Sequence, residues 1–362
     1  MVTEAKYDQL DSLLERHGAE SAWFATPASF AWLAGGDNTV SLAGNRGVAA
    51  AGYDGEEIEV ITDHIETDRI SNEEVSNEVT VHTFDWYETD LPTAISERAK
   101  TPAVADIDVP GLDLIDHPQQ HLPLTEREQE QFAELGRETA AVVETVAREV
   151  TPVMTERSAA GELACHLRKR GIAPLVVLVG SAERNQKYRH FTSKDVPLGD
   201  YVTLTVLGRR AGLHASLTRT VAFDPPEWLT DRHRSTSRVS ATALRATQRD
   251  GRRGGNAESV FSAIQRAYKA VGFPDEWHAH HQGGPAGYRG REWFAHPDGK
   301  QPLVLPKAYA WNPTISGTKS EDTNLVTEEK IELLTETGDW PTMSVDPIGE
   351  GGAVTHHSIL RR

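Results

Sequence analysis

The chain has 362 residues, 38% of them hydrophobic, which is enough to bury the cores of two domains of ordinary size. Its 54 acidic residues outnumber the 37 basic ones, and the net charge of −17 disfavours nucleic acid and anionic membranes as partners. No apolar run approaches the roughly 20 residues that span a bilayer. The one cysteine, Cys165, excludes an intramolecular disulfide, so we expect a cytoplasmic protein.

Arginine outnumbers lysine among the 37 basic residues, of which 27 are Arg and 10 are Lys. An excess of carboxylates with few lysines suits a cytoplasm rich in salt, because carboxylates stay hydrated while dissolved ions screen their repulsion. We therefore expect a halophilic protein. Cys165 lies in a helical pattern, where we expect it to be a small buried apolar residue.

Residues 1–117 alternate helical patterns with short apolar runs. Helices are predicted over residues 1–18 and 90–100, and strands within residues 21–27, 46–53, 57–63, 79–84 and 101–108. This alternation is typical of a small α/β domain. A polar connector containing proline follows, and we place the domain boundary between residues 117 and 118.

Residues 118–362 begin with a strong helix signal, because Thr125 and Glu128 have the spacing of a capping box. The helix predicted from there has its apolar positions close to one face, at Phe132, Leu135, Val142, Val146 and Val150. A second helix, a strand over residues 174–180 and a β-hairpin over residues 199–223 follow, with Gly208 and Gly212 expected in the hairpin turn. Two more helical patterns precede residues 280–293, and another hairpin is expected over residues 323–335.

Residues 280–293 read HHQGGPAGYRGREW, which suits neither a core helix nor a core strand. Such a cluster of ionisable groups costs free energy unless it is paired or solvated. The segment could therefore serve a metal ion, a proton transfer or a ligand, or it could be a solvated loop.

Taken in order, several segments resemble the creatinase/aminopeptidase P/prolidase family, which has the pita-bread fold. Residues 199–223 resemble its strand hairpin, and His281 with Gly284 resembles its His-x-x-Gly turn. Residues 311–313 resemble a strand that ends in Glu-Pro, residues 320–329 resemble a closing Glu-Asp-Thr hairpin, and residues 20–36 resemble the start of a creatinase-type N-terminal domain. The resemblance implies an α/β (α+β) protein with a creatinase-like domain over 1–117 and a pita-bread domain over 118–362. It also implies a homodimer.

The chain departs from this family at the metal ligands. Metal-dependent members hold two divalent ions with two Asp, one His and two Glu, whose anionic oxygens compensate the charge of the ions. The corresponding residues of this sequence are Thr205, Ser216, His281, Asn312 and Glu321. One carboxylate cannot compensate two dications, so we predict that the dinuclear site is lost and that no cofactor is bound. A single weakly held ion on His281 and Glu321 is the alternative.

The same fold includes creatinase, which resembles this chain in lacking the metal ions. There a histidine acts as general base and acid on a small guanidino compound, and His281 holds that position. A neutral imidazole can accept a proton from water and return it to a leaving nitrogen. Glu321 is expected to orient His281 or to bind a cationic group of the substrate. Arg291 and Glu292 belong to a Gly-Arg-Glu triplet that resembles one in creatinase, shifted by one residue.

Further residues are expected to contact the substrate. Thr205, Ser216 and Asn312 would supply neutral hydrogen bonds, and His190 resembles a substrate-facing histidine of the family. Tyr288, Arg291 and Glu292 are also expected to bind the substrate. Tyr288 stands where many members have a second histidine, which weakens a peptidase assignment.

Simpler structural roles remain open for several of these residues. His281 could pack under the Gly-Gly turn, and Arg291 and Glu292 could form an ordinary ion pair. His278 and His280 are expected to be solvated loop residues. Arg219 matches a Thr-Arg-Thr motif in which the arginine is largely structural.

Three functions are compatible with the sequence. The first is a metal-independent hydrolase of a C–N bond in a small nitrogenous compound, with His281 as proton shuttle. The second is an aminopeptidase or dipeptidase of Xaa-Pro type acting on a short peptide-like substrate. The third is a non-catalytic protein of the same fold that binds a ligand or a partner. The missing carboxylates argue against the second, and nothing in the sequence separates the first from the third.

Overall fold

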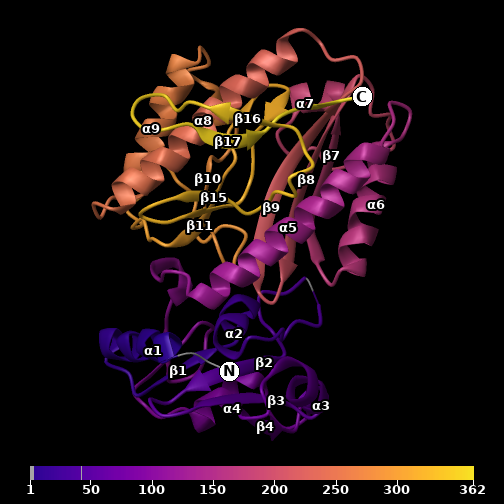
Figure 1. Cartoon of the computed structure of the whole chain (residues 1–362). Helices are drawn as coiled ribbons and strands as arrows, with labels where there is room; N and C mark the ends of the chain where they lie inside the picture. Colours follow the sequence, from indigo (N-terminus) through magenta and orange to yellow (C-terminus); the bar gives the residue numbers. More distant parts are fainter. Residues whose placement is uncertain (1–3, 42) are drawn as a thin grey trace. The chain divides into compact units, whose positions relative to one another are not determined.

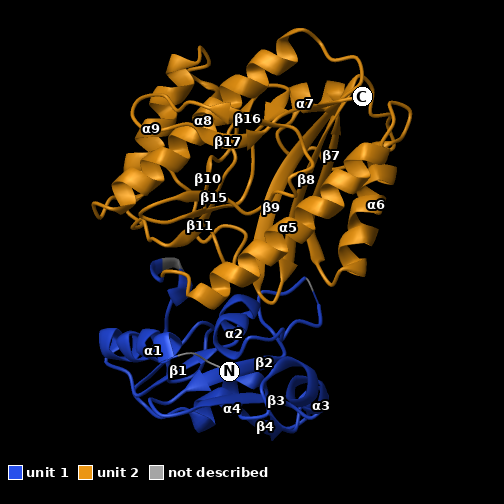
Figure 2. Ribbon diagram, viewed as in Figure 1, with its two compact units in different colours: residues 1–122 blue, residues 123–362 orange. Residues whose placement is uncertain are grey.

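The computed structural model describes residues 4–41 and 43–362. They form two compact units, the first ending at Leu122 and the second beginning at Pro123 (Figure 2). The boundary expected from the sequence, between residues 117 and 118, falls slightly earlier, at the start of the short 3-10 helix η2 (Pro118–His121). The helix predicted over residues 1–18 begins outside the described residues, and its described part is α1 (Glu4–His17).

Unit 1 is built on a six-stranded mixed sheet (Figure 1). Its strands, in the spatial order β4-β3-β2-β1-β5-β6, are β1 (Ser21–Phe24), β2 (Ala49–Tyr53), β3 (Ile58–Asp63), β4 (Thr80–Phe84), β5 (Ala103–Ala105) and β6 (Asp113–Leu114). Besides α1, its helices are α2 (Pro27–Ala34), α3 (Thr67–Arg69), the π-helix η1 (Ile70–Glu74) and α4 (Leu91–Arg98). Each of the five apolar runs of the sequence contains one of β1 to β5, which confirms the α/β character of this part.

Unit 2 contains a four-stranded sheet in the order β18-β9-β8-β7. The strands are β7 (Ala173–Ser181), β8 (Tyr201–Arg210), β9 (Leu213–Ala222) and β18 (Leu360–Arg361). Helix α5 (Glu126–Glu149) packs against β8 and β9, α6 (Glu156–Lys169) packs against β7, and the short helix α7 (Ala182–Lys187) follows β7 (Figure 1).

A second four-stranded sheet of unit 2 is antiparallel throughout, in the order β10-β11-β14-β15. Its strands are β10 (Gly283–Ala286), β11 (Lys307–Trp311), β14 (Asn324–Val326) and β15 (Ile331–Leu333). Two short strand pairs join β12 (Thr314–Ile315) to β13 (Thr318–Lys319) and β16 (Thr342–Val345) to β17 (Val354–His357). Helices α8 (Trp228–Gly251) and α9 (Ala257–Ala270) pack on each other and share a core with Tyr309 and Trp311 of β11, and the 3-10 helix η3 (Glu276–Ala279) follows α9. This arrangement is the predicted pita-bread type of fold.

The long helix α5 forms as its sequence predicts. Thr125 and Glu128 make the complete capping box, which satisfies backbone N–H groups that the first turn leaves without partners. The five apolar positions named above are all at most 2% exposed, so the predicted face is the buried one.

The β8–β9 hairpin turns at Gly212, as expected, but Gly208 lies outside the turn. Its turn is Ala211-Gly212, with φ values of 48° and 76°, which suits a tight two-residue hairpin. Gly208 lies inside β8, where an added Cβ would come within 2.7 Å of Ile172 Cγ2. Gly208 therefore serves close packing and not the turn, which corrects the sequence-based expectation.

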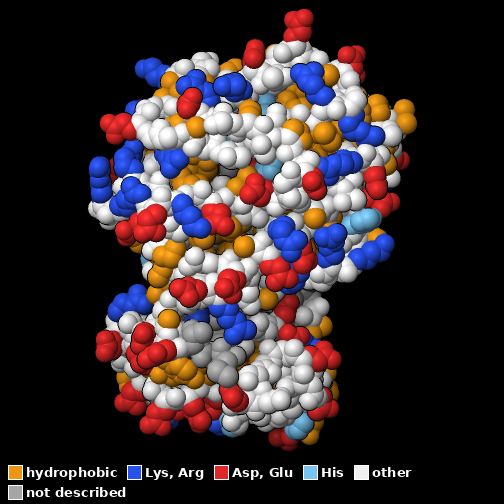
Figure 3. Space-filling view, in the orientation of Figure 1, with side chains coloured by type: hydrophobic (Ala, Val, Ile, Leu, Met, Phe, Trp, Pro, Cys, Tyr) orange, Lys and Arg blue, Asp and Glu red, His pale blue; other side chains and the backbone are white. Residues whose placement is uncertain are grey.

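Cys165 is exposed on α6, so the prediction of a buried cysteine is wrong. The buried face of α6 is set by Ala159, Leu163 and Leu167, and Cys165 falls between those positions. Acidic and basic side chains are interspersed on the face of the protein drawn in Figure 3. None of the helices in the described residues is long and apolar enough to cross a bilayer.

Candidate active site

The five residues at the expected ligand positions all belong to unit 2 and come from separate elements. Thr205 lies on β8, Ser216 on β9, His281 just before β10, Asn312 just after β11, and Glu321 between β13 and β14. In the hairpin Thr205 pairs with Thr218, and Leu207 pairs with Ser216. Because alternate residues of a strand point to the same face, Thr205, Ser216 and Thr218 share one face of the hairpin.

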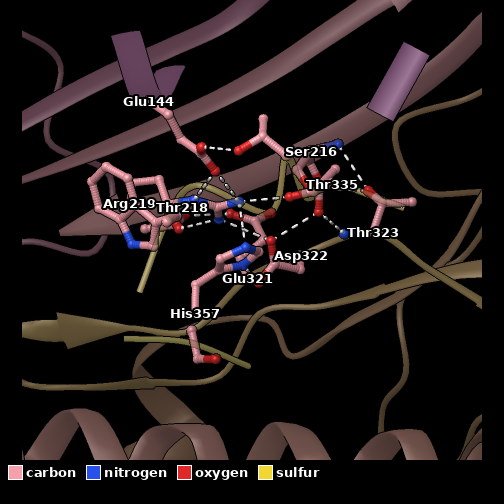
Figure 4. A network of polar contacts seen from close by, with 12 residues as sticks. Glu144, Ser216, Thr218, Arg219, Glu321, Asp322, Thr323, Thr335 and His357 are labelled. Atoms are coloured by element: carbon pink, nitrogen blue, oxygen red, sulfur yellow. Dashed lines mark hydrogen bonds and ion pairs between the residues drawn. The ribbon is translucent and has the colours of Figure 1, made fainter. Parts of the chain in front are cut away.

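The segment that carries Glu321 is attached along β9. Thr218 N–H donates to the Glu321 carbonyl at 2.9 Å, and Thr323 Oγ1 accepts from Ser216 N–H at 3.0 Å and donates to the Ser216 carbonyl at 2.9 Å (Figure 4). The side chain of Glu321 thereby reaches the hairpin face, where Thr218 Oγ1 donates to Glu321 Oε2 at 2.8 Å. Thr205 joins the same chain of contacts through an Oγ1–Oγ1 distance of 2.8 Å to Thr218.

Two cations of the chain itself bind Glu321. Arg291 Nη2 lies 2.9 Å from Glu321 Oε1, and Lys319 Nζ lies 2.8 Å from Glu321 Oε2. All three side chains are at most 6% exposed. We call Glu321, Arg291, Lys319 and Thr218 the Glu321 cluster. It contains one carboxylate and two cations, so its formal charge is positive.

The cations keep the carboxylate of Glu321 ionised. Burial by itself raises the pKa of a carboxyl group, but Lys319 and Arg291 outweigh burial here and lower the pKa of Glu321 to about 2. Both oxygens of Glu321 are already engaged. The structure therefore does not place Glu321 where it orients His281 or receives a cationic substrate group.

Arg291 also reaches the second of the substituted positions. Its Nη1 donates to Ser216 Oγ at 3.1 Å and to the Gly290 carbonyl at 2.6 Å. The guanidinium group therefore bridges Ser216 and Glu321. Glu292 instead pairs with Lys307 at 2.6 Å, so the ordinary Arg291–Glu292 ion pair considered from the sequence does not form.

Asn312 and Tyr288 lie apart from these contacts. Asn312 N–H donates to the Gln282 carbonyl at 3.0 Å, and Asn312 Oδ1 has no hydrogen-bond partner among the described residues. Tyr288 donates to Glu128 Oε1 at 2.9 Å, and burial raises the pKa of the Tyr288 hydroxyl well above its usual value. The buried Tyr288–Glu128 contact gives this tyrosine a structural role.

Three histidines meet beside the Gly-Gly turn. His190 Nε2 and His280 Nε2 are 3.1 Å apart, and the rings of His280 and His281 stack with centroids 4.3 Å apart. The rings of His190 and His281 are 5.8 Å apart, and Phe294 lies 4.4 Å from the His281 ring. We call His190, His280 and His281 the histidine cluster. His280 is 8% exposed, so the prediction of a solvated His280 is wrong, whereas His278 is exposed as expected.

The three imidazoles are held in the neutral form. Burial, together with Arg291 and Lys319 and against the opposing effect of Glu321, lowers the pKa of His281 to about 4. Burial lowers the pKa of His280 to about 2 and also lowers that of His190. Lys319 lowers the pKa of all three histidines and Glu321 raises it, so the charges of the Glu321 cluster act on the histidine cluster.

Arg219 of β9 lies in a buried network of polar contacts next to the site (Figure 4). Its guanidinium group donates to Glu144 Oε1 at 3.3 Å, to Asp322 Oδ1 at 2.9 Å and to the Thr335 carbonyl at 2.6 Å. His357 Nδ1 lies 2.9 Å from Asp322 Oδ2. Burial would raise the pKa of Asp322, but His357 and Arg219 lower it well below its usual value.

A sequence model described as metallopeptidase family M24 matches residues 130–328, more than half of the chain. The chain belongs to metallopeptidase family M24. No curated protein matches its sequence.

Solved structures agree with this assignment at the level of the fold. An Xaa-Pro dipeptidase from Bacillus anthracis is 16% identical, with a TM-score of 0.73 over 92% of this chain and 97% of that one. A prolidase from Pyrococcus furiosus is 18% identical, with a TM-score of 0.71 over 90% and 99%. The N-terminal domain of the FACT complex subunit SPT16 from Cicer arietinum is 12% identical, with a TM-score of 0.66 over 92% and 95%.

The ligand positions of this M24 protein do not fit a pair of divalent ions. Thr205 and Ser216 are neutral. Both carboxylate oxygens of Glu321 already bind groups of the chain, namely Lys319, Thr218 and Arg291. A cation entering this cluster would meet two positive charges and one negative charge. Hard dications need several anionic oxygens, so the cluster opposes them.

Sequence reasoning missed Lys319, Thr218 and His280 as parts of this M24 site. A signal for Lys319 and Thr218 was present, because each lies two residues from a position that the family comparison singles out. In extended chain such neighbours point to the same face. His280 had no such signal, since adjacent histidines in a strand-like segment are expected to face opposite ways.

Proposed function

We propose that this M24 protein hydrolyses a C–N bond in a small nitrogenous compound without the family's two metal ions, and that His281 shuttles the proton. The observation that carries the proposal is the engagement of Glu321 by Arg291 and Lys319, which puts fixed positive charge where metal ligands would converge. His281 is solvent-accessible, and no hydrogen bond to it is found among the described residues.

The proposed chemistry uses His281 twice. Its neutral imidazole accepts a proton from a water molecule as the water oxygen attacks the carbon of the C–N bond. The resulting imidazolium has a low pKa and readily gives the proton to the leaving nitrogen, so proton and electron pair leave together as an amine or ammonia. When the attacked carbon belongs to a carbonyl group, the positive charge of Arg291 and Lys319 favours the anionic oxygen that develops on it.

The other predicted site residues take supporting parts in this proposal. His190, whose ring lies 5.8 Å from that of His281, contacts the substrate beside the proton shuttle. Asn312 offers a side-chain oxygen that has no partner in the described residues. Glu321 pairs with both cations and Ser216 accepts from Arg291, whereas Thr205 contacts Thr218 of the same cluster. In this proposal these three residues do not need to touch the substrate.

Two other functions provide the competing expectations. The similar prolidase and Xaa-Pro dipeptidase structures suggest cleavage of Xaa-Pro peptides, which in a metallopeptidase requires metal ions. The similar SPT16 domain belongs to a protein described as a complex subunit, which suggests a binding role. The experiment below separates the three.

The test is turnover by chelated protein. The protein is treated with EDTA, freed of chelator by gel filtration, and incubated with a panel of guanidino compounds, ureas, amides and Xaa-Pro dipeptides, with products followed by mass spectrometry. We expect hydrolysis of a small non-peptide member of the panel at the same rate before and after chelation. Activity on Xaa-Pro dipeptides that is lost on chelation and restored by MnCl₂ would contradict the proposal. Absence of turnover on the whole panel would favour the binding role.

A further inference from the structure

We propose that His190, His280 and His281 form a binding site for one divalent transition-metal ion of the zinc type, which shares only His281 with the ligand positions of the M24 fold. One ligand atom from each of the three side chains lies within 4.8 Å of the others. Of the three, only His281 is one of the five ligand positions expected from the family comparison. His190 comes from the segment between α7 and β8, and His280 follows η3, so the fold itself brings the three together.

The spacing is close to what a tetrahedral ion requires. Zinc–nitrogen bonds of about 2.0–2.1 Å at tetrahedral angles place two ligand nitrogens roughly 3.3–3.4 Å apart. His190 Nε2 and His280 Nε2 are 3.1 Å apart, so this pair needs almost no movement. The His281 ring stacks on His280 with centroids 4.3 Å apart and reaches solvent, so the His281 side chain has to turn out of this stack to bring a nitrogen to the same ion.

The chemistry of the three side chains selects the metal. Imidazole nitrogen suits Zn²⁺, Co²⁺, Ni²⁺ and Cu²⁺, whereas Mg²⁺ and Mn²⁺ prefer oxygen ligands. His190 and His281 are accessible to solvent, which leaves a path for entry and a fourth position for water.

Neighbouring charges set the strength of the site. Lys319 and Arg291 oppose a dication, and Glu321 favours it with a single negative charge. We therefore expect reversible binding that a chelator removes, and not a permanently held ion.

An ion on these histidines would take the lone pair that His281 needs to accept a proton. If the proposed function is correct, on which this step rests, Zn²⁺ inhibits hydrolysis. Binding itself does not depend on that proposal, so the two are tested separately.

The binding test titrates Co²⁺ into EDTA-treated protein and follows the visible absorption of tetrahedral cobalt, with Zn²⁺ binding measured by calorimetry. We expect one ion per chain. His190→Ala should weaken binding by at least about tenfold, the lower end of what even outer partners of a metal site contribute. His278→Ala is the matched control, because His278 is an exposed histidine of the same segment that stacks on Trp277 with centroids 3.5 Å apart. It should bind as the parent does.

Folding is checked by the melting temperature of each variant, and His190 is preferred to the buried His280 because its removal leaves no cavity. The proposal is overturned if the parent shows no tetrahedral cobalt spectrum, or if His190→Ala binds as tightly as His278→Ala. In the activity arm, Zn²⁺ that binds with this stoichiometry but accelerates hydrolysis would contradict the metal-independent mechanism and leave the binding site intact.

Discussion

His281→Ala should lower hydrolysis of the substrate found in the panel by about 10²–10⁴-fold, the usual contribution of a general acid–base group. The melting temperature should change little, because His281 is solvent-accessible and its contacts are ring contacts with His190, His280 and Phe294. His281→Gln should be equally inactive, since an amide keeps a polar side chain but cannot take up a proton near neutral pH. The measurement is kcat and kcat/KM for both variants with the melting temperature beside them.

His278→Ala serves as the control, because it removes a nearby histidine that lies outside the cluster. If His281→Ala keeps parental turnover, the proton shuttle is a different group, and His190→Ala is the next variant to assay. Equal losses in His281→Ala and His278→Ala would point to disturbance of the whole segment.

Arg219→Ala should destabilise unit 2 by about 3–5 kcal/mol, the cost of breaking a buried ion pair on one side only. Arg219 is 1% exposed and holds Glu144 and Asp322, so its removal leaves two buried carboxylates without their main cation. With roughly 2–4 °C lost per kcal/mol for a domain of this size, the melting temperature should fall by about 10 °C. Urea unfolding followed by circular dichroism measures the change.

Arg210→Ala is the matched control for this arginine. Arg210 pairs with Glu138 at 2.7 Å and Glu134 at 3.3 Å, but its side chain is 27% exposed. Partly exposed ion pairs contribute about 1 kcal/mol or less, so this variant should unfold nearly as the parent does. A similar loss of stability in the two variants would show that the buried ion pairs of Arg219 stabilise unit 2 no more than the partly exposed ion pairs of Arg210 do.

Much of the fold is predictable because its signals are local. The capping box of Thr125 and Glu128 predicts the start of α5, and short apolar runs between helical patterns predict β1 to β5. The hairpin and the place of Gly212 in its turn are predicted correctly, but Gly208 is wrongly assigned to the turn, because it is needed for close packing on Ile172. A glycine in the sequence does not show by itself whether it is needed for a turn or for close packing inside a strand.

The site was predictable in its positions and not in its contacts. The spacing of motifs led to Thr205, Ser216 and Glu321, which the structure links through Thr218 and Arg291. The pairing of Arg291 with Glu321 could not be read from the chain, because the competing neighbour Glu292 is adjacent in sequence. In the folded chain Arg291 pairs with Glu321, whereas Glu292 pairs with Lys307 of β11. The exposure of Cys165 and the burial of His280 likewise depend on which way one residue in a helix or loop faces.

The most direct measurement is an anomalous difference map from a crystal soaked in MnCl₂ and recorded at the manganese edge. We predict that Arg291 Nη2 and Lys319 Nζ occupy the two oxygens of Glu321, and that no anomalous peak lies within bonding distance of Glu321, Ser216 or Asn312. A peak confined to the three histidines is compatible with this arrangement. Two peaks beside Glu321, with Arg291 and Lys319 displaced, would contradict the replacement of the metal ions by the chain's own cations.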